Sequence, residues 1–195
     1  RLPQALKEVL ARLPETADAM DVLRTGISVL GTLEPETKEG GIDAVGRRLM
    51  GCLPGVLLQW YRREKPDTDA MTTDCESAAR NLLTLLHGKP QSPVAERAIE
   101  VSLIVYAEHD FNASTFAARV AASTLSDAYS CYVAAISALR GPLHGSANAA
   151  VLRFLKRYKS ADEAEAAVRE MLKQKARIPG FGQRAYSKSD PRNAI

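Results

Sequence analysis

The residues from Ala113 to Leu139 read ASTFAARVAASTLSDAYSCYVAAISAL, and this stretch carries most of the information about the fold class. It is rich in Ala, Ser and Val, and its only charged residues are Arg119 and Asp127. Small apolar side chains with few charges suit a helix that is buried among other helices better than a solvated one. We therefore expect one central buried helix here, packed closely against its neighbours, and it could share a dimer interface.

Helical spacing of apolar residues continues towards the N-terminus. Leu6 and Leu10 recur with Lys7 and Glu8 on the other side, which predicts a short amphipathic helix that ends at Pro14. Further helices are expected at residues 20–30 and, after a surface loop at residues 31–41, at about residues 42–63 with an interruption near Pro54.

Start signals mark the remaining helices. Thr73 and Glu76 have the reciprocal capping spacing before an apolar run to residue 86, and Ser92 followed by Pro93 precedes a run to residue 107. Two more helices are expected, one after Pro142 that carries residues 151–158 and one from Ser160, with Glu163 as its capping partner, to about residue 175. Glycines and a proline predict irregular backbone from residue 178 onward.

The pattern excludes several fold classes. No alternation of period two is present, and no Gly-rich turn follows a predicted strand, so dinucleotide-binding and P-loop folds have no support. No repeat of fixed period indicates a helical solenoid. We expect an all-α fold.

Composition narrows the function classes. The 195 residues, 46% of them hydrophobic, suffice for one domain or pieces of two. A formal charge of +3 from 26 basic and 23 acidic residues is not the concentrated field of a nucleic-acid binder. Cys52, Cys75 and Cys131 are odd in number and lie among apolar residues, which favours reduced thiols over disulfides or a metal site. No apolar run reaches the roughly 20 residues that span a bilayer, so we expect a soluble protein without a membrane partner.

Two of the three histidines lie at predicted helix ends. His87 ends a Leu-rich helix before Gly88, where a cation suits the negative end of the helix dipole, so capping or surface placement is favoured over substrate contact. His109 follows an apolar helix and precedes a predicted cap at Asn112 or Ser114. Taken alone, this position suits a buried, hydrogen-bonded histidine somewhat better than a ligand.

The third histidine lies in a segment with turn-forming residues. His144 belongs to Gly-Pro-Leu-His-Gly-Ser-Ala-Asn, residues 141–148, where Gly and Ala permit a close approach of backbone to a small ligand. A tight corner between two helices explains the same spacing equally well.

A final segment combines glycines with polar groups. Gly180-Phe181-Gly182 could hold a cofactor against its backbone, although a simple interdomain loop is the preferred interpretation of a lone glycine pattern. Arg192 has a planar guanidinium that could bind a substrate carboxylate with two hydrogen bonds. A salt bridge to Asp190 is the alternative.

Together these segments resemble the citrate synthase family over essentially the whole chain. The resemblance rests on the order and wording of the motif at His109 to Phe116, the run at residues 123–127, the Gly-Pro-x-His-Gly motif at His144, and Gly-Phe-Gly followed by Asp-Pro-Arg at residues 190–192. Residues 21–26, 33–36 and 60–61 look more like the 2-methylcitrate synthase branch than like plain citrate synthases.

The resemblance implies an all-α, cytoplasmic homodimer that condenses an acyl-CoA with oxaloacetate. Residues 1–143 would form part of a large helical domain, and residues 144–195 would begin a small domain whose closure completes the site. His144 matches the histidine that stabilises the enol or enolate of the acyl-CoA, and His109 and Arg192 match the oxaloacetate-binding histidine and arginine. Gly180, Phe181 and Gly182 match backbone at the CoA site. No permanently bound cofactor or metal is implied, because the acyl-CoA is a co-substrate.

Two departures limit this expectation. Gln183 occupies the position after Gly-Phe-Gly where the family has a second catalytic histidine, and an amide can donate a hydrogen bond but cannot act as a general acid. The family's catalytic aspartate would lie beyond Ile195, so we expect an internal fragment that is inactive alone. Gln183 also keeps open a different class of function, a catalytically impaired homologue that binds oxaloacetate or acyl-CoA in a non-enzymatic role.

Overall fold

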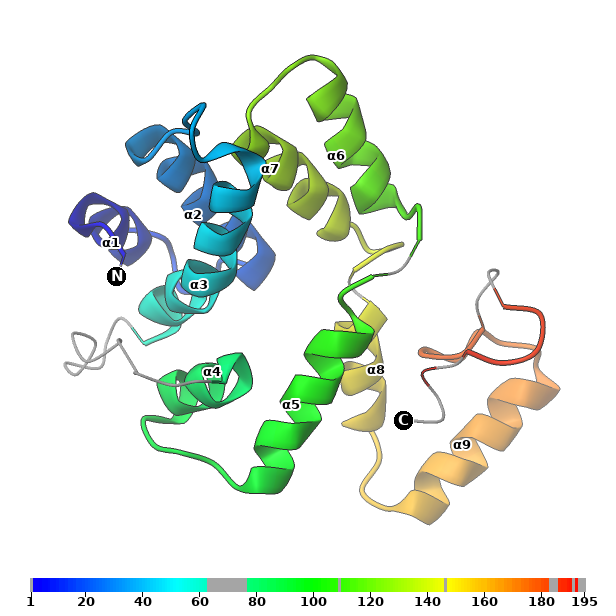
Figure 1. The fold of residues 1–195 in the computed structure, drawn as a ribbon. Coiled ribbons are helices and arrows are strands. Elements are labelled where there is room, and N and C mark those ends of the chain that lie inside the picture. Colours follow the sequence, from blue (N-terminus) through cyan, green and yellow to red (C-terminus); the bar gives the residue numbers. More distant parts are fainter. Residues whose placement is uncertain are drawn as a thin grey trace. The chain divides into compact units, whose positions relative to one another are not determined.

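The computed structural model describes residues 2–62, 77–108, 110–145, 147–182, 186–190 and 192. All regular secondary structure in these residues is helical, which confirms the all-α prediction (Figure 1). The helices are α1 (Gln4–Ala11), α2 (Ala19–Leu33), α3 (Gly41–Tyr61), α4 (Ala78–His87), α5 (Pro93–Val105), α6 (Ala113–Ser123), α7 (Ala128–Leu139), α8 (Ala147–Leu155) and α9 (Ala161–Lys173). The chain forms two compact units, residues 1–138 and 139–195.

The core of the first unit lies where α2 packs against α1 and α3 and the start of α7. Two glycines of α2 make this packing possible. A Cβ atom at Gly26 would lie 2.3 Å from Val56 Cγ1, and one at Gly31 would lie 2.7 Å from Tyr129 Cβ. Trp60 is buried and donates from Nε1 to the Pro14 carbonyl at 3.2 Å. The buried core residues are Leu6, Leu10, Val22, Ile27, Leu30, Val45, Leu49, Cys52, Val56, Trp60, Ala128 and Tyr129.

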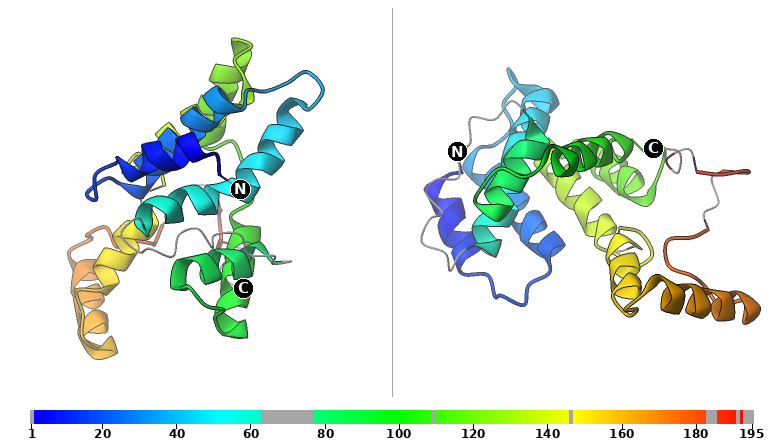
Figure 2. Two further views of the ribbon diagram at one scale, coloured as in Figure 1. Left: turned by 90° about the vertical axis from the view of Figure 1, so that its left-hand side faces the viewer. Right: turned by 90° about the horizontal axis from the view of Figure 1, so that it is seen from below.

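The expected interruption near Pro54 is a bend within one helix. Helical backbone runs from Gly41 to Tyr61 through Pro54, and the two halves of α3 point in different directions (Figure 2, left). A proline inside a helix removes one backbone donor and crowds the preceding turn, which kinks the helix without ending it when packing holds both sides.

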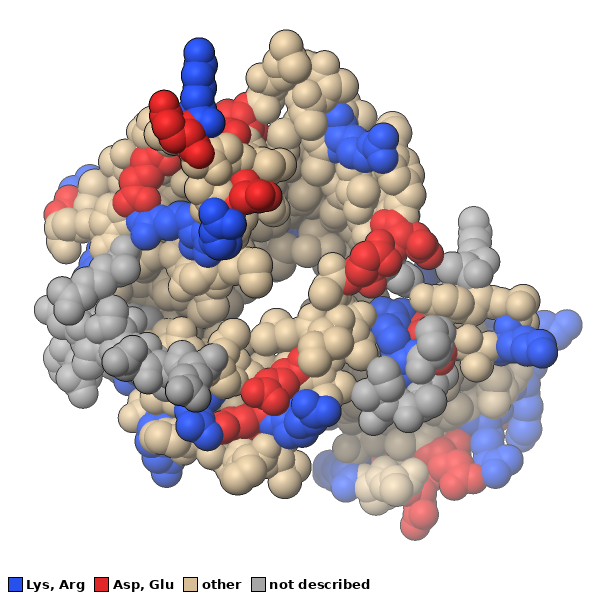
Figure 3. All heavy atoms as spheres, viewed as in Figure 1, with Lys and Arg blue, Asp and Glu red and all other residues tan. Residues whose placement is uncertain are grey.

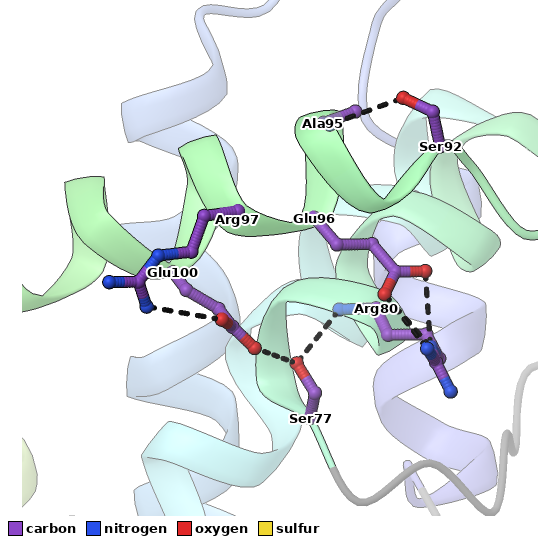
Figure 4. A network of polar contacts seen from close by, with 7 residues as sticks. All are labelled: Ser77, Arg80, Ser92, Ala95, Glu96, Arg97 and Glu100. Atoms are coloured by element: carbon purple, nitrogen blue, oxygen red, sulfur yellow. Dashed lines mark hydrogen bonds and ion pairs between the residues drawn. The ribbon is translucent and has the colours of Figure 1, made fainter.

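A polar network joins α4 to α5 (Figure 4). Ser77 accepts a hydrogen bond from the Arg80 backbone at 3.3 Å, so it caps α4, and it donates to Glu100 at 3.0 Å. Arg80 donates from Nε to both carboxylate oxygens of Glu96 at 3.1 Å. The helix predicted up to residue 86 is therefore confirmed, with Ser77 as its N-cap. The expected capping pair, Thr73 and Glu76, lies outside the described residues.

Both ends of α5 and the C-terminal end of α4 follow local signals. Ser92 caps α5 and Pro93 is its first residue, as predicted. His87 is exposed and is the last residue of α4, followed by Gly88 in the left-handed region at φ 74°. This placement confirms the surface interpretation of His87.

The prediction of one continuous helix at residues 113–139 is wrong, whereas its burial in a dimer stays a prediction. The segment forms two helices, and Leu125 between them has a left-handed φ of 61°. Asp127 accepts two hydrogen bonds from Ser130, and Glu36 accepts one from the Ala128 backbone at 2.7 Å, so side chains satisfy a helix start at this position. In addition, α6 has no buried residue within this chain.

The second unit contains α8, α9 and irregular backbone after them. Phe154 is buried and its ring meets that of Tyr158 edge to face at 5.2 Å. Ser160 accepts from the Glu163 backbone at 3.2 Å, and the Glu163 carboxylate accepts from the Lys159 backbone at 2.8 Å. The predicted cap of α9 is thus confirmed. Residues 178–182 and 186–190 carry no helix, as expected.

The surface and the thiols match the composition. Lys and Arg lie among Asp and Glu on the face drawn in Figure 3, without a continuous basic field there. Cys52 and Cys131 are free thiols, and burial raises the pKa of both. Across the described ranges, no helix is long and apolar enough to cross a bilayer, and no cluster of His, Cys, Asp and Glu could hold a metal ion.

Candidate functional site

His144 lies in a tight turn directly after α7. Its backbone N–H donates to the Gly141 carbonyl at 3.0 Å, and the Gly145 N–H donates to the Leu139 carbonyl at 3.0 Å. A Cβ atom at Gly145 would lie 2.3 Å from the Leu139 carbonyl oxygen, so a side chain there would force the backbone to move. The His144 side chain is partly buried. The turn therefore fixes the backbone that carries the His144 side chain, in the connection that leads to α8.

The residues that flank His109 are held by local contacts. Asp110 has a left-handed φ of 54°, and its N–H donates to the Glu108 carboxylate at 2.8 Å. Asn112 caps α6 by accepting from the Ser114 and Thr115 backbones at 2.9 and 3.1 Å, which confirms the expected cap. His109 itself lies outside the described residues, so its role stays a prediction.

An aromatic cluster covers the start of α6. The rings of Phe111 and Phe116 meet edge to face with centroids 6.0 Å apart. The Arg119 guanidinium lies 5.1 Å from the Phe111 centroid, within the range of a cation–π contact. Because Phe111 precedes the Asn112 cap, the cluster holds the first turn of α6 to the connection before it.

The Gly180–Gly182 segment is a turn that requires glycine twice. Gly180 and Gly182 have φ values of 87° and 83°, which side chains rarely adopt. The Phe181 N–H donates to the Ile178 carbonyl at 3.3 Å, and the Phe181 side chain is 75% exposed. A Cβ atom at Gly180 would lie 2.8 Å from Val151 Cγ2 of α8. The turn therefore packs on α8 at one glycine and presents an aromatic ring outward, while Gln183 lies outside the described residues.

Arg192 is paired with Asp190, the alternative that the sequence left open. Its Nε and Nη2 donate to the two carboxylate oxygens at 2.9 and 2.5 Å, and its backbone N–H donates to the same carboxylate at 3.0 Å. Both side chains are partly buried, at 31% and 19% exposed. The planar guanidinium makes two parallel hydrogen bonds to this carboxylate, so the pairing orients the Arg192 side chain.

The described site residues belong to the second unit, whereas His109 belongs to the first. The second unit thus contains His144, the Gly180–Gly182 turn and Arg192. How these residues relate to His109 stays a prediction. The division of the chain into large-domain and small-domain parts also stays a prediction. Sequence reasoning named Val151 only as an apolar helix residue and missed its contact with Gly180, because no local pattern links positions 29 residues apart.

A cavity of about 280 Å³ in the first unit is not this site. It lies between α2 and the start of α7, and none of the predicted site residues lines it. The lining residues are Ser28, Gly31, Thr32, Asp127, Tyr129, Ser130 and Val133. The candidate site therefore comprises the His144 turn and the Gly180–Gly182 turn.

Similar proteins agree on one family. Residues 1–195 match the family model described as citrate synthase, C-terminal domain. The chain is 48% identical to a 2-methylcitrate synthase of Shewanella oneidensis over 100% of its length and 52% of the relative, and 40% identical to a citrate synthase of Mycolicibacterium smegmatis over 98% and 52%. The chain thus spans about half the length of these curated relatives.

Solved structures show the same fold. A citrate synthase of the thermophilic archaeon Thermoplasma acidophilum, determined as a ternary complex with carboxymethyl coenzyme A and oxaloacetate, superposes with a TM-score of 0.83 at 28% identity over 100% of this chain and 52% of that one. The citrate synthase of Thermotoga maritima gives a TM-score of 0.74 at 34% identity over 100% and 51%. The chain belongs to the citrate synthase family.

Proposed function

We propose that a protein containing this chain condenses an acyl-CoA with oxaloacetate and releases CoA. The observation that carries the proposal is the His144 turn, which combines the Gly-Pro-x-His-Gly sequence with two backbone hydrogen bonds that hold the backbone around the histidine. The fold shared with a citrate synthase that was solved with carboxymethyl coenzyme A and oxaloacetate supports the same substrates here.

In this reaction the catalytic aspartate that the family resemblance implies removes an α-proton of the acyl-CoA. His144 donates a hydrogen bond to the thioester oxygen, which stabilises the enol or enolate as negative charge develops there. The nucleophilic carbon attacks the carbonyl carbon of oxaloacetate, whose carboxylates are bound by His109 and Arg192. The carbonyl oxygen becomes an alkoxide that takes its proton from water, because the Gln183 amide cannot act as a general acid. Hydrolysis of the thioester then releases CoA from the Gly180–Gly182 turn. The proposed reaction requires no permanently bound cofactor, because the acyl-CoA is a co-substrate. We also infer a cytoplasmic location for the protein.

Within the family we propose that propionyl-CoA is the preferred acyl donor. The 48% identity to a 2-methylcitrate synthase, against 40% to a citrate synthase, supports this branch. The test needs a polypeptide of the relatives' full length that contains this chain, called the full-length form below. We expect its kcat/KM to be higher with propionyl-CoA than with acetyl-CoA, measured from free thiol release at saturating oxaloacetate. Equal or reversed values would contradict the branch assignment but not the reaction.

Gln183 supports a second candidate function, a homologue that binds oxaloacetate or acyl-CoA without turning them over. An amide at this position keeps a hydrogen-bond donor and loses the general acid. The same assay separates the two functions. Binding of either ligand without thiol release in the full-length form would favour the binding protein.

We also propose that the protein is a homodimer and that α6 contributes to its interface. None of the described residues of α6 is buried in the single chain, and Phe116 and Val120 are 58% and 51% exposed. Apolar residues beside small ones allow a second helix to approach closely, which is typical of the core of an interface.

Replacing Ala121 by Arg in the full-length form should weaken the dimer. A charge without a partner in an apolar interface costs about 3 kcal/mol or more, equivalent to a rise of at least about 100-fold in the dimer dissociation constant. Sedimentation equilibrium measures this constant. Ala166→Arg, at an exposed position of α9, is the matched control and should leave the constant unchanged. A monomeric wild type, or a dimer that is insensitive to Ala121→Arg, would exclude this interface.

A further inference from the structure

The second unit joins two parts of the proposed site through one short helix. The His144 turn ends immediately before α8, and Val151, in the middle of α8, lies against Gly180. Sequence similarity assigns roles to the turn and to the glycines, whereas nothing assigns one to Val151. Its place between them is the reason to ask what it does.

The contact between Val151 and Gly180 is closer than any side chain at position 180 would allow. A Cβ atom there would lie 2.8 Å from Val151 Cγ2, with Cγ1 and Cβ of the same valine at 3.8 and 3.9 Å. The three heavy atoms nearest to this position all belong to Val151, so its side chain is the closest neighbour of Gly180 on that side. A branched side chain has few rotamers in a helix, so it offers a stiff surface.

The other glycine of the turn lacks such a support. Gly182 has nearly the same backbone conformation, with φ 83° against 87°, but a Cβ atom there would meet no heavy atom of the described residues within 4 Å. Gly180 therefore has two requirements, a positive φ and a close neighbour, whereas Gly182 has only the first. Phe181 between them is 75% exposed, so neighbouring side chains do not hold the turn through its ring.

We infer that Val151 is a positioning residue for the acyl-CoA site: it holds the backbone at Gly180 so that the Gly180–Gly182 turn presents its peptide groups to the CoA moiety. The inference rests on the proposed function, because that function assigns the turn to CoA. Val151 contacts no substrate in this scheme. It acts through the position of the turn, and its substitution should change CoA affinity and the KM for acyl-CoA more than kcat.

The test is a double-mutant cycle on the dissociation constant of free CoA, measured by calorimetry on the full-length form. We expect Gly180→Ala to raise this constant about tenfold or more, because the added methyl collides with Val151 and strains the turn. Val151→Ala alone should raise it about threefold by removing the support. The combination should bind CoA better than Gly180→Ala alone, because the truncated side chain leaves room for the new Cβ atom.

Gly182→Ala provides the control for backbone strain. It imposes the same left-handed conformation on alanine without the collision, so Val151→Ala should not improve CoA binding by the Gly182→Ala variant. Val168→Ala, the same truncation of a partly buried valine in α9, should leave CoA affinity unchanged. Equal rescue of both glycine variants, or of neither, overturns the inference.

Two further measurements keep the outcomes distinct. If Gly180→Ala fails to fold by circular dichroism, the comparison of Val151→Ala with Val168→Ala decides alone, and equal CoA affinities overturn the inference. In steady-state assays, Val151→Ala should raise the KM for acyl-CoA and leave kcat and the KM for oxaloacetate within about twofold of wild type. A wild type that does not bind CoA also overturns the inference. A wild type that binds CoA but releases no thiol contradicts the proposed reaction and leaves the cycle valid.

Discussion

Replacing His144 by Ala in the full-length form should lower kcat for condensation by about 10²–10³, because one hydrogen-bond donor to a developing oxyanion contributes this much in comparable sites. The reaction needs the thioester oxygen to carry negative charge, and in the proposed mechanism the His144 imidazole is the donor to that oxygen. Binding of oxaloacetate and of free CoA should change little, because neither ligand contains the thioester.

The measurement is single-turnover thiol release together with calorimetry of both ligands. His87→Ala is the matched control, since His87 is exposed at the end of α4 and should be replaceable without effect on kcat. A His144→Ala enzyme with unchanged kcat would remove His144 from the mechanism. A large loss of CoA and oxaloacetate binding in the same variant would instead indicate that His144 supports the fold of the second unit.

Local signals in the sequence predicted much of the fold. Three helix caps lie within three residues of the backbone groups that they accept from, so their pattern can be read without tertiary information. They are Ser92, Asn112 and Ser160. The apolar spacing of α1 and α2 predicted which residues form the core, and Leu6 and Leu10 are fully buried there.

The errors arise where distant residues decide the local structure. The helix predicted at residues 113–139 breaks near Leu125, and the new start at Ala128 is satisfied by Glu36, which is 92 residues away in sequence. No sequence pattern near residue 125 predicts that Glu36 accepts this hydrogen bond. The low charge of the segment predicted burial in the chain or in a dimer interface, and none of the described residues of α6 is buried in the single chain. Few charges are typical both of a core and of the centre of an interface, so composition alone does not separate the two.

The candidate site shows the same division. Motif resemblance predicted the site residues His144, the Gly180–Gly182 turn and Arg192. The positive φ of both glycines explains why the motif has glycine at these two positions. The sequence offered the local pair of Arg192 with Asp190 as an alternative, and the structure forms it. Resemblance could not show that Val151 lies against Gly180, since that contact depends on how the chain returns on itself. It also could not decide the effect of Gln183, where the residue departs from the motif that surrounds it.

Replacing Gln183 by His in the full-length form should raise turnover. The frame of Gly180-Phe181-Gly182 and Asp190-Pro191-Arg192 is intact in sequence, so one position differs within a preserved motif. Both the amide and the imidazole can donate a hydrogen bond to the carbonyl of oxaloacetate. The dissociation constant for oxaloacetate should therefore differ by at most about 3-fold between Gln183→His and wild type. What the amide lacks is a proton to transfer to the oxygen that becomes an alkoxide as the new carbon–carbon bond forms, a contribution of about 10²–10⁴ in rate.

The measurement is steady-state kcat of Gln183 and Gln183→His enzymes at saturating oxaloacetate and acyl-CoA, with Gln183→Asn as the matched amide control that should not exceed wild type. A pH profile adds a second readout, because a histidine near its ordinary pKa of about 6.5 introduces a titration into kcat that an amide cannot produce. Equal rates for Gln and His when chemistry is rate-limiting would show that position 183 does not limit condensation. Absence of thiol release from both, with oxaloacetate still bound, would move the assignment to the binding protein, because restoring the general acid would then have restored nothing.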